Sequence, residues 1–417
     1  MDGGPVHQQR SRLPLVALLL ASVAVVALAI AAASWQPQSV QDLQVYRDAA
    51  VRLLDGRALY PPGSGYGPDQ PLPFTYPPFA ALLFVPLAVV PVGSATVLWW
   101  IACAACLLWL TRRSFAPAMP ELGPLGRAAF VVVVALALLL VAAPVARAFA
   151  YGQIGLFLAV LCLVDLDRAA RRSRGTGLLV GIAAAVKLTP AAFALTLLAA
   201  GRRRAVVVSA AACLALWAAA ALVLPDDTRT WLGLVGDAER IGPVDGAVNV
   251  TWHGLWLRTL GASTLTTALW VACSTATLAV ATVRSGRLLR SGQALTAATV
   301  MGFAAVVAAP VAWLHHAVWV VPLVGIVLDD GRSWRRWVVA AGLFGALSEP
   351  ATSWQDLAIG TPDVSGVPGW LWVNTCVLVM AAVVVLLRPG PSTVPTTSDR
   401  DARRNGQIAP LEGGSCP

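Results

Sequence analysis

Charged residues are scarce in this chain, and lysine is almost absent. Of 417 residues, 58% are hydrophobic and only 12% are charged. A soluble domain usually carries about twice that charged fraction, so the composition excludes an ordinary soluble protein. Lys187 is the only lysine, and the other members of the 30 basic residues are arginines. No soluble segment mixes basic with aromatic residues, so the net charge of +9 does not indicate nucleic-acid binding.

Histidine and cysteine are too scattered to indicate a metal or redox site. The four histidines do not have metal-ligand spacing. Cys103 and Cys106 have the spacing of a redox pair, but they lie in an apolar run without a βαβ context. We therefore expect neither a bound metal nor a cofactor.

Apolar runs recur along almost the whole chain. Many are roughly 17 to 25 residues long, the length of a membrane-crossing helix, and helices satisfy their own backbone groups in lipid. The sequence predicts an all-α, polytopic membrane protein of about twelve transmembrane helices. The predicted spans lie near 13–33, 94–111, 127–146, 152–167, 176–188, 190–201, 205–224, 264–283, 293–311, 317–329, 336–350 and 368–387.

The arginines predict the orientation in the membrane. They cluster in short connections between apolar runs, which is typical of cytoplasmic loops. This places the protein in the plasma membrane as a multi-pass protein with both termini cytoplasmic. Residues 1–387 form the predicted membrane domain, and residues 388–417, rich in Pro, Ser, Thr and Gly, a disordered cytoplasmic tail. The clusters are Arg112-Arg113, Arg168 to Arg174, Arg202 to Arg204, Arg284 to Arg290, and Arg332 to Arg336.

Two stretches depart from simple spans. Residues 79–91 are apolar but short, which leaves open whether they re-enter, lie at the interface or cross. The runs 176–188 and 190–201 are also short and meet at Thr189-Pro190. Proline cannot continue the hydrogen-bond ladder, so a broken helix is expected there, and broken helices at membrane depth line cavities.

An amphipathic helix is predicted at the start of the first outer loop. Leu43, Tyr46 and Ala50 follow helical spacing and are followed by apolar Leu53 and Leu54, so one face is apolar and suits a membrane surface. Asp42 opens this segment. It is either an N-cap, where aspartate is favoured, or a general base, and the two roles are compatible.

Polar residues near the predicted outer ends of the spans are the candidate site. Lys187 is either a snorkelling side chain or a cation for a phosphate group. Gln153 is costly in lipid unless it faces a partner or a cavity. Neighbouring His315 and His316 point about 100° apart on a helix, so at most one faces a given cavity. The remaining candidates for substrate binding are Tyr46, Tyr76, Asn249 and His253.

These residues all fall on the outer face in a topology drawn from the arginines alone. They supply a base, a cation and several hydrogen-bond donors. Those groups suit a transfer in which a hydroxyl attacks and a phosphate leaves. The convergence, more than any single residue, predicts an outward-facing active site.

The same residues resemble those of a known family. Asp42 to Tyr46, Thr75 to Pro78, Gly152-Gln153, Lys187 to Pro190 and His315-His316, in this order, resemble actinobacterial glycosyltransferase family 87. The resemblance covers about Asp42 to Pro322. It implies the GT-C fold and a polyprenyl-phosphate-mannose-dependent α-(1→2)-mannosyltransferase. It also implies a glycolipid or lipoglycan acceptor on the outer side, an inverting reaction, and Asp42 as the base. Lys187, His315 and His316 would hold the donor phosphate.

Three alternatives remain open. The family often has a more amide-rich stretch where this chain has Asn249 to His253, and related members transfer arabinofuranose from a polyprenyl-phosphate donor. Asp165 and Asp167 have the spacing of a metal-diphosphate site for a nucleotide sugar at the cytosolic face, although they abut basic residues. A lipid or sugar transporter would also explain a broken helix and an intramembrane lysine, but no internal repeat is visible.

The topology is testable by cysteine accessibility in intact cells. Single cysteines near Asp69 and Asp237, in a background without the native cysteines, should react with a membrane-impermeant reagent. Cysteines near Arg172 and Arg203 should react only after lysis. Labelling of the Arg203 position from outside would contradict the orientation, because every candidate site residue would then lie on the cytosolic face.

Overall fold

The structure is a computed structural model, and it describes residues 40–64, 72–119, 122–348 and 366–389. Within these ranges the chain is helical, and its one β-bridge is an isolated pair, Asn249 with Trp313. The predicted first span at 13–33 and most of the tail lie outside the described residues. The helices are α2 (Gln41–Leu54), α3 (Pro78–Ala88), α4 (Val92–Ser114), α5 (Pro124–Val141), α6 (Ala143–Ala150), α7 (Gly155–Ala170), α8 (Leu178–Val186), α9 (Phe193–Ala199), α10 (Arg203–Val223), α11 (Pro225–Leu234), α12 (Trp252–Leu260), α13 (Thr264–Arg290), α14 (Ala294–Ala308), α15 (Val320–Leu328), α16 (Trp334–Leu347) and α18 (Gly366–Leu386).

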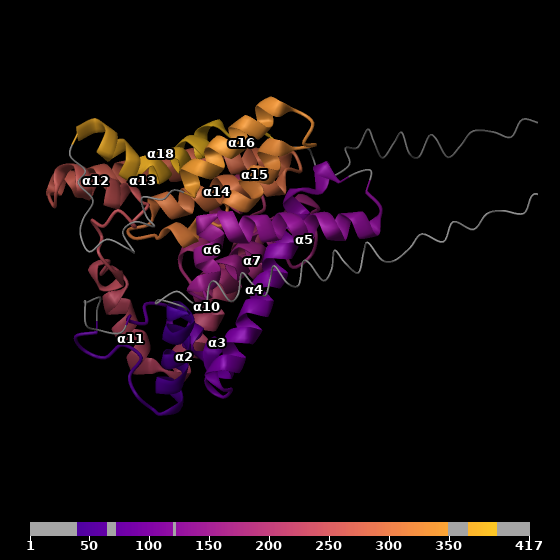
Figure 1. Ribbon diagram of the computed structural model, residues 1–417. Coiled ribbons are helices and arrows are strands. Elements are labelled where there is room, and N and C mark those ends of the chain that lie inside the picture. The colour runs from indigo at the N-terminus through magenta and orange to yellow at the C-terminus, as the bar shows by residue number, and fades with distance from the viewer. Residues whose placement is uncertain (1–39, 65–71, 120–121, 349–365, 390–417) are drawn as a thin grey trace, which may run out of the picture.

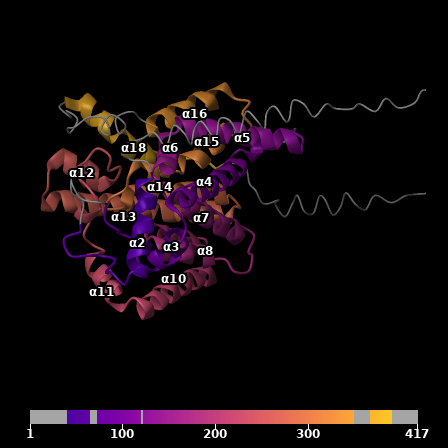
Figure 2. The ribbon, with the colours of Figure 1, turned by 60° about the horizontal axis from the view of Figure 1, so that its bottom comes forward.

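The helices form two groups joined by α6 and α7. Figure 1 shows α12 to α18 on one side and α2, α3, α10 and α11 on the other, with α6 and α7 between them. The turned view of Figure 2 keeps α2, α3, α8 and α10 together. Helix α14 is buried along nearly its whole length and packs against α7, α13 and α18. It therefore forms the centre of the fold, whereas α10 presents apolar Val207, Leu214 and Leu222 outward.

Among the described residues, fewer helices are long enough to cross a membrane than the sequence predicted. Within the described ranges, five helices are long and apolar enough to cross a membrane: α4, α5, α10, α13 and α18. The bent pair α6–α7, which turns by 117°, brings the number to six at most. Helices α8, α9 and α15 are shorter than a bilayer requires. The protein is thus an all-helical, multi-pass membrane protein, and the predicted number of twelve is not confirmed.

The predicted helix break lies between α8 and α9. Helix α8 ends at Val186, Lys187 has an extended backbone, and a 3-10 turn, η2 (Thr189–Ala192), carries Pro190 before α9 begins. The prediction of a break at Thr189-Pro190 is confirmed. Residues 79–91 include all but the first residue of the 11-residue helix α3, which has Pro86 inside it and is again too short to be assigned as a span.

The helix predicted at the start of the first outer loop is present as α2. Its buried residues are Leu43, Tyr46, Ala49 and Ala50, which share one face, and the helix packs against α3. Much of the apolar face is therefore covered by protein, while Leu54 at its end is 56% exposed. Its placement at a membrane surface stays a prediction.

The first turn of α2 is held by the bend between α6 and α7. The backbone N–H of Val40 donates to Ala150 O, and those of Asp42 and Leu43 both donate to Tyr151 O. These bonds satisfy N–H groups that a helix start otherwise leaves unpaired. The approach is so close that a Cβ on Gly152 would lie 2.6 Å from Leu43 Cβ, and Gly152 has φ +69°. Glycine is required there on both grounds.

We expect Gly152→Ala to loosen this junction. Gly261 provides a matched control because it has the same φ of +69° but nothing within 4 Å of its Cβ position. Both substitutions incur the backbone strain, whereas Gly152→Ala also incurs the clash, so it should cost about 1 to 3 kcal/mol more. Thermal unfolding in detergent measures the difference. Equal losses of stability in the two variants would show that the contact with Leu43 is not tight.

Candidate functional site

Lys187 and His316 form a contact at the helix break. The Lys187 Nζ lies 2.9 Å from His316 Nε2. Lys187 comes from the extended residue after α8, and His316 ends the 3-10 turn η4 (Leu314–His316) that follows α14. Two interruptions of helical structure, 129 residues apart in sequence, thus bring a cation and an imidazole together.

The hydrogen bonds of His316 fix which ring nitrogen carries the proton. Its Nδ1 accepts from the backbone N–H of Trp313 at 2.9 Å. A neutral imidazole that accepts at Nδ1 carries its proton on Nε2. The Nε2–H therefore faces the Lys187 ammonium, and two donors oppose each other. An oxygen with free lone pairs placed against both nitrogens would satisfy them, which makes the pair a candidate anion site.

A chain of hydrogen bonds leads from Lys187 toward Gln153. The Lys187 ammonium donates to Tyr76 Oη at 3.5 Å, and its Nζ lies 5.1 Å from the centre of that ring. The Tyr76 and Tyr46 hydroxyl oxygens are 3.0 Å apart, and Tyr46 donates to Gln153 Oε1 at 3.4 Å. Each hydroxyl has one proton, so all three bonds coexist only when Tyr76 donates to Tyr46.

Asp42 stands at the other end of this chain. Its Oδ2 is buried and has no hydrogen-bond partner among the described residues. Burial raises the pKa of the Asp42 carboxyl to about 6, against the opposing effects of the Gln153 amide and the Lys187 charge. The N-cap of α2 is Val40, and no side chain caps this helix start. The N-cap interpretation of Asp42 is therefore wrong, and its carboxylate is available for other chemistry.

The two histidines have different surroundings, as their spacing predicted. Only His316 contacts Lys187, while the His315 ring packs edge-on against Tyr151 with centroids 5.6 Å apart. His315 is 4% exposed, and its Nε2 is buried without a partner in the described part of the chain. The rings of the two histidines are 4.5 Å apart, so His315 lies directly behind the lysine–histidine contact.

A largely apolar cavity opens beside Lys187 and His316. It encloses about 580 Å³, open space at its mouth included. One wall is the Trp319 ring, which lies against α14 where a Cβ on Gly302 would come within 2.1 Å of it. Neither residue was singled out from the sequence. The other apolar residues that line the cavity include Leu158, Ala159, Pro190, Phe193, Val306 and Val318.

Asn249 is not brought into this cluster. It is fully buried, its Oδ1 accepts from the Ala312 backbone N–H and from Thr251, and its Nδ2 donates to Val244 O. The side chain holds the loop after α11 against the segment that leads to η4. Its position therefore indicates a structural role.

His253 lies on α12, next to the same segment. Its Nδ1 lies 3.1 Å from Pro310 O, and its ring stacks on Trp270 with centroids 4.4 Å apart. No contact joins it to Lys187 or Asp42 in the described structure. Nearby, Arg258 bonds to Gly246 O, Asn249 O and Asn374, the last on α18. Sequence reasoning missed Arg258 because an isolated arginine gives no motif.

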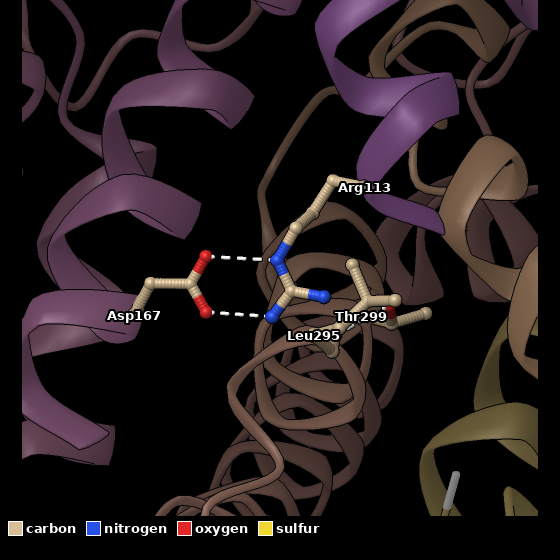
Figure 3. A network of polar contacts seen from close by, with 4 residues as sticks. All are labelled: Arg113, Asp167, Leu295 and Thr299. Carbon is tan, nitrogen blue, oxygen red and sulfur yellow. Dashed lines mark hydrogen bonds and ion pairs between the residues drawn. The ribbon is translucent and has the colours of Figure 1, made fainter. Parts of the chain in front are cut away.

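The acidic pair near the end of α7 is occupied by structural contacts. Asp165 is buried and accepts from the backbone N–H groups of Gly177 and Val180 at the start of α8. Asp167 binds Arg113 of α4 through both carboxylate oxygens, beside Leu295 and Thr299 of α14 (Figure 3). These bonds account for the presence of both aspartates, so a nucleotide-sugar site is not needed to explain them. Over the described ranges no three acidic, histidine or cysteine side chains are placed to hold a metal ion.

The fold and this cluster define a class of protein. A helical membrane protein that sets a buried carboxylate near a cation and an imidazole, beside an apolar cavity, has the groups of a lipid-dependent transferase. A family model described as glycosyltransferase family 87 matches residues 74–311. The chain belongs to this family and is a glycosyltransferase. The two histidines lie just after the matched range, and Asp42 precedes it by 32 residues.

Curated relatives agree with this assignment. The chain is 36% identical over 299 residues to a Mycobacterium tuberculosis polyprenol-phosphate-mannose-dependent alpha-(1-2)-phosphatidylinositol pentamannoside mannosyltransferase, covering 71% of this chain and 67% of the relative. It is 31% identical over 381 residues to the alpha-(1-2)-phosphatidylinositol mannoside mannosyltransferase of that species, covering 84% of this chain and 86% of the relative. The pentamannoside enzyme of Mycolicibacterium smegmatis is 36% identical over 287 residues, or 68% of each chain. No solved structure matches the chain.

Proposed function

We propose that this protein transfers a mannosyl residue from polyprenyl-phosphate-mannose to a hydroxyl group of a phosphatidylinositol mannoside, forming an α-(1→2) linkage at the outer face of the plasma membrane. The observation that carries the proposal is the cluster in which Asp42 and the Lys187–His316 pair are linked through two tyrosines and Gln153. The relatives named above favour mannose over arabinofuranose and a glycolipid acceptor.

Asp42 is the general base in this mechanism. The acceptor hydroxyl attacks C1 of the mannosyl group while its proton passes to the free Asp42 oxygen. The bond from C1 to the phosphate oxygen breaks, and its electron pair leaves with the polyprenyl phosphate. A single displacement inverts the anomeric carbon and needs no second carboxylate as a nucleophile. A pKa near 6 leaves the carboxylate ionised at neutral pH and still basic enough to assist.

Lys187 and His316 hold the phosphate. A phosphate oxygen that approaches the pair from the side accepts from both the Nε2–H and the ammonium, which turn toward it because their nitrogens, 2.9 Å apart, leave no room for an atom between them. The negative charge that develops on the leaving group strengthens both bonds. His315, packed behind the pair, supports its geometry. The apolar cavity beside them takes the isoprenoid units nearest the phosphate, because its walls offer hydrocarbon and aromatic contacts.

The base role predicts a large loss of turnover in Asp42→Asn. Asparagine keeps the size of the side chain but cannot accept the acceptor's proton. General-base catalysis contributes roughly 10² to 10⁴-fold, so turnover with polyprenyl-phosphate-mannose and phosphatidylinositol mannosides should fall at least 100-fold. Asp48, exposed on the same helix, provides the control: Asp48→Asn should keep near-normal activity. A loss below about threefold in Asp42→Asn at matched folded protein would refute the base role.

The pH profile gives a second, independent test of Asp42. Because its pKa is raised to about 6, the wild-type kcat/KM should fall about tenfold per pH unit below that value, as the base becomes protonated. The residual activity of Asp42→Asn should lack this acidic limb. An unchanged limb in the variant would assign it to another group.

The phosphate role predicts that Lys187→Ala raises the KM for the donor. Loss of one charged hydrogen bond should weaken donor binding about 10- to 100-fold, with the KM for the acceptor little changed. Lys187→Arg should recover only part of the loss, since a planar fork does not replace a compact ammonium. Lys187 is the only lysine, so reductive ¹³C-methylation gives a single side-chain signal. Polyprenyl phosphate should shift that signal, and no shift at saturation would remove the phosphate role.

A further inference from the structure

A second, strongly basic hollow lies apart from the candidate active site. It is formed by the connection between α7 and α8 and by the start of α10, and it encloses about 1030 Å³ including its open side. Five arginines line it and no acidic residue does. The arginines are Arg172, Arg174, Arg202, Arg203 and Arg204, and the remaining lining residues are small or apolar except Ser173 and Thr176.

The charges of this hollow are not neutralised from within the described protein. Arg202 donates through Nε to Ala169 O, which fixes its position at the rim. The guanidinium groups of Arg172, Arg174 and Arg204 have no ion pair or hydrogen bond to any described residue. The nearest acids in sequence, Asp165 and Asp167, are turned to other partners. Burial and the Arg172 charge lower the pKa of Arg202.

The position of these arginines on α10 is unfavourable in an empty hollow. Arg203 and Arg204 begin this 21-residue helix, directly after Arg202 as its N-cap. The N-terminus of a helix carries a partial positive charge, where acidic side chains and anions are stabilising and basic ones are not. The preference for arginine in cytoplasmic loops sets the membrane orientation and does not require the arginines to lie at any particular position in the loop. Arg203 and Arg204 are exposed, so solvent screens part of this repulsion. An anion at this helix start, opposite Arg172 and Arg174, would offset the remainder.

The hollow lies at the opposite end of α7 from Gln153. Helix α7 runs for 16 residues from Gly155 to Ala170, a rise of about 24 Å. Helix α8 packs beside it and returns to Lys187. This separation is shorter than the roughly 30 Å thickness of a bilayer core, and α8, with nine residues, rises only about 14 Å before it reaches Lys187. The placement of the hollow toward the opposite leaflet rests on the outer-face active site of the proposed function.

We propose that this hollow binds the phosphate headgroup of an anionic glycerophospholipid in the leaflet opposite the candidate active site. The lipid phosphate would lie between the two loops, at the start of α10, where guanidinium groups from both sides can form bidentate hydrogen bonds with it. Its acyl chains would follow the apolar outer face of α10. Free phosphate shares the binding chemistry, and the experiment separates the two sources.

The test compares lipid retention by the full-length protein. Wild type, a hollow variant (Arg172→Gln, Arg174→Gln and Arg204→Gln) and a charge-matched control (Arg112→Gln, Arg287→Gln and Arg335→Gln) are purified in the same detergent. The control arginines are exposed and lie outside the hollow. Native mass spectrometry measures binding of phosphatidylglycerol and phosphatidylcholine, and thermal unfolding measures the effect of inorganic phosphate.

Wild type and the control should retain one phosphatidylglycerol tightly and phosphatidylcholine weakly. The hollow variant should bind that phosphatidylglycerol about 100-fold more weakly, given the contribution of each arginine near a lipid surface. Equal losses in the hollow and control variants would show a diffuse positive surface and overturn the proposal. Stabilisation by millimolar phosphate that displaces the lipid and depends on the same arginines would identify a small-anion site and overturn the lipid assignment. The melting temperature of the hollow variant shows whether it is folded. If both variants lose stability, the control variant should still bind phosphatidylglycerol, so a loss of binding in the hollow variant alone is not caused by reduced stability.

Discussion

The candidate site depends on the junction between the first turn of α2 and the end of α6. The carbonyl oxygens of Ala150 and Tyr151 at the end of α6 accept hydrogen bonds from the backbone N–H groups at the start of α2. Since both partners are backbone groups, main-chain geometry sets the position of the Asp42 Cα relative to Gln153, and the rotamer of Asp42 then directs its carboxylate. The junction exists only because Gly152 leaves no side chain between the two helices. One small residue thus connects a loop outside the central bundle to its core.

The polar cluster built on that junction has a direction. With the ammonium of Lys187 as a donor at one end and a carboxylate near the other, the hydroxyls of Tyr76 and Tyr46 must both point their protons toward Gln153. The Gln153 carbonyl oxygen is then occupied, which leaves its amide hydrogens for Asp42. The two tyrosines therefore orient other groups, and their bonds satisfy the polar atoms of Tyr46 and Gln153, the two residues of this hydrogen-bond chain that are buried.

Sequence reasoning worked where local chemistry dictates structure. Pro190 cannot continue a helix, and the break that exposes Lys187 follows from that property alone. It could not supply contacts with distant partners. Asn249 stays a predicted binding residue, but its hydrogen bond with Ala312, 63 residues away in the chain, has no local signal. The count of spans is not confirmed for a related reason, because an apolar run such as 317–329 fits a short helix buried in the bundle as well as one that crosses the bilayer. Arg258, joined to Asn374 across 116 residues, had no local signature at all.

The opposed donors at Lys187 and His316 have a consequence for the rate-limiting step. If the donor is the phosphodiester proposed above, it brings one negative charge to this pair. The departing polyprenyl phosphate is a monoester, which carries between one and two negative charges at neutral pH. A site that prefers more negative charge holds its product more tightly than its substrate, because both nitrogens donate to it. Turnover would then be governed by how fast the spent lipid leaves the pocket, and the accumulated carrier would act as a competitive inhibitor of the enzyme.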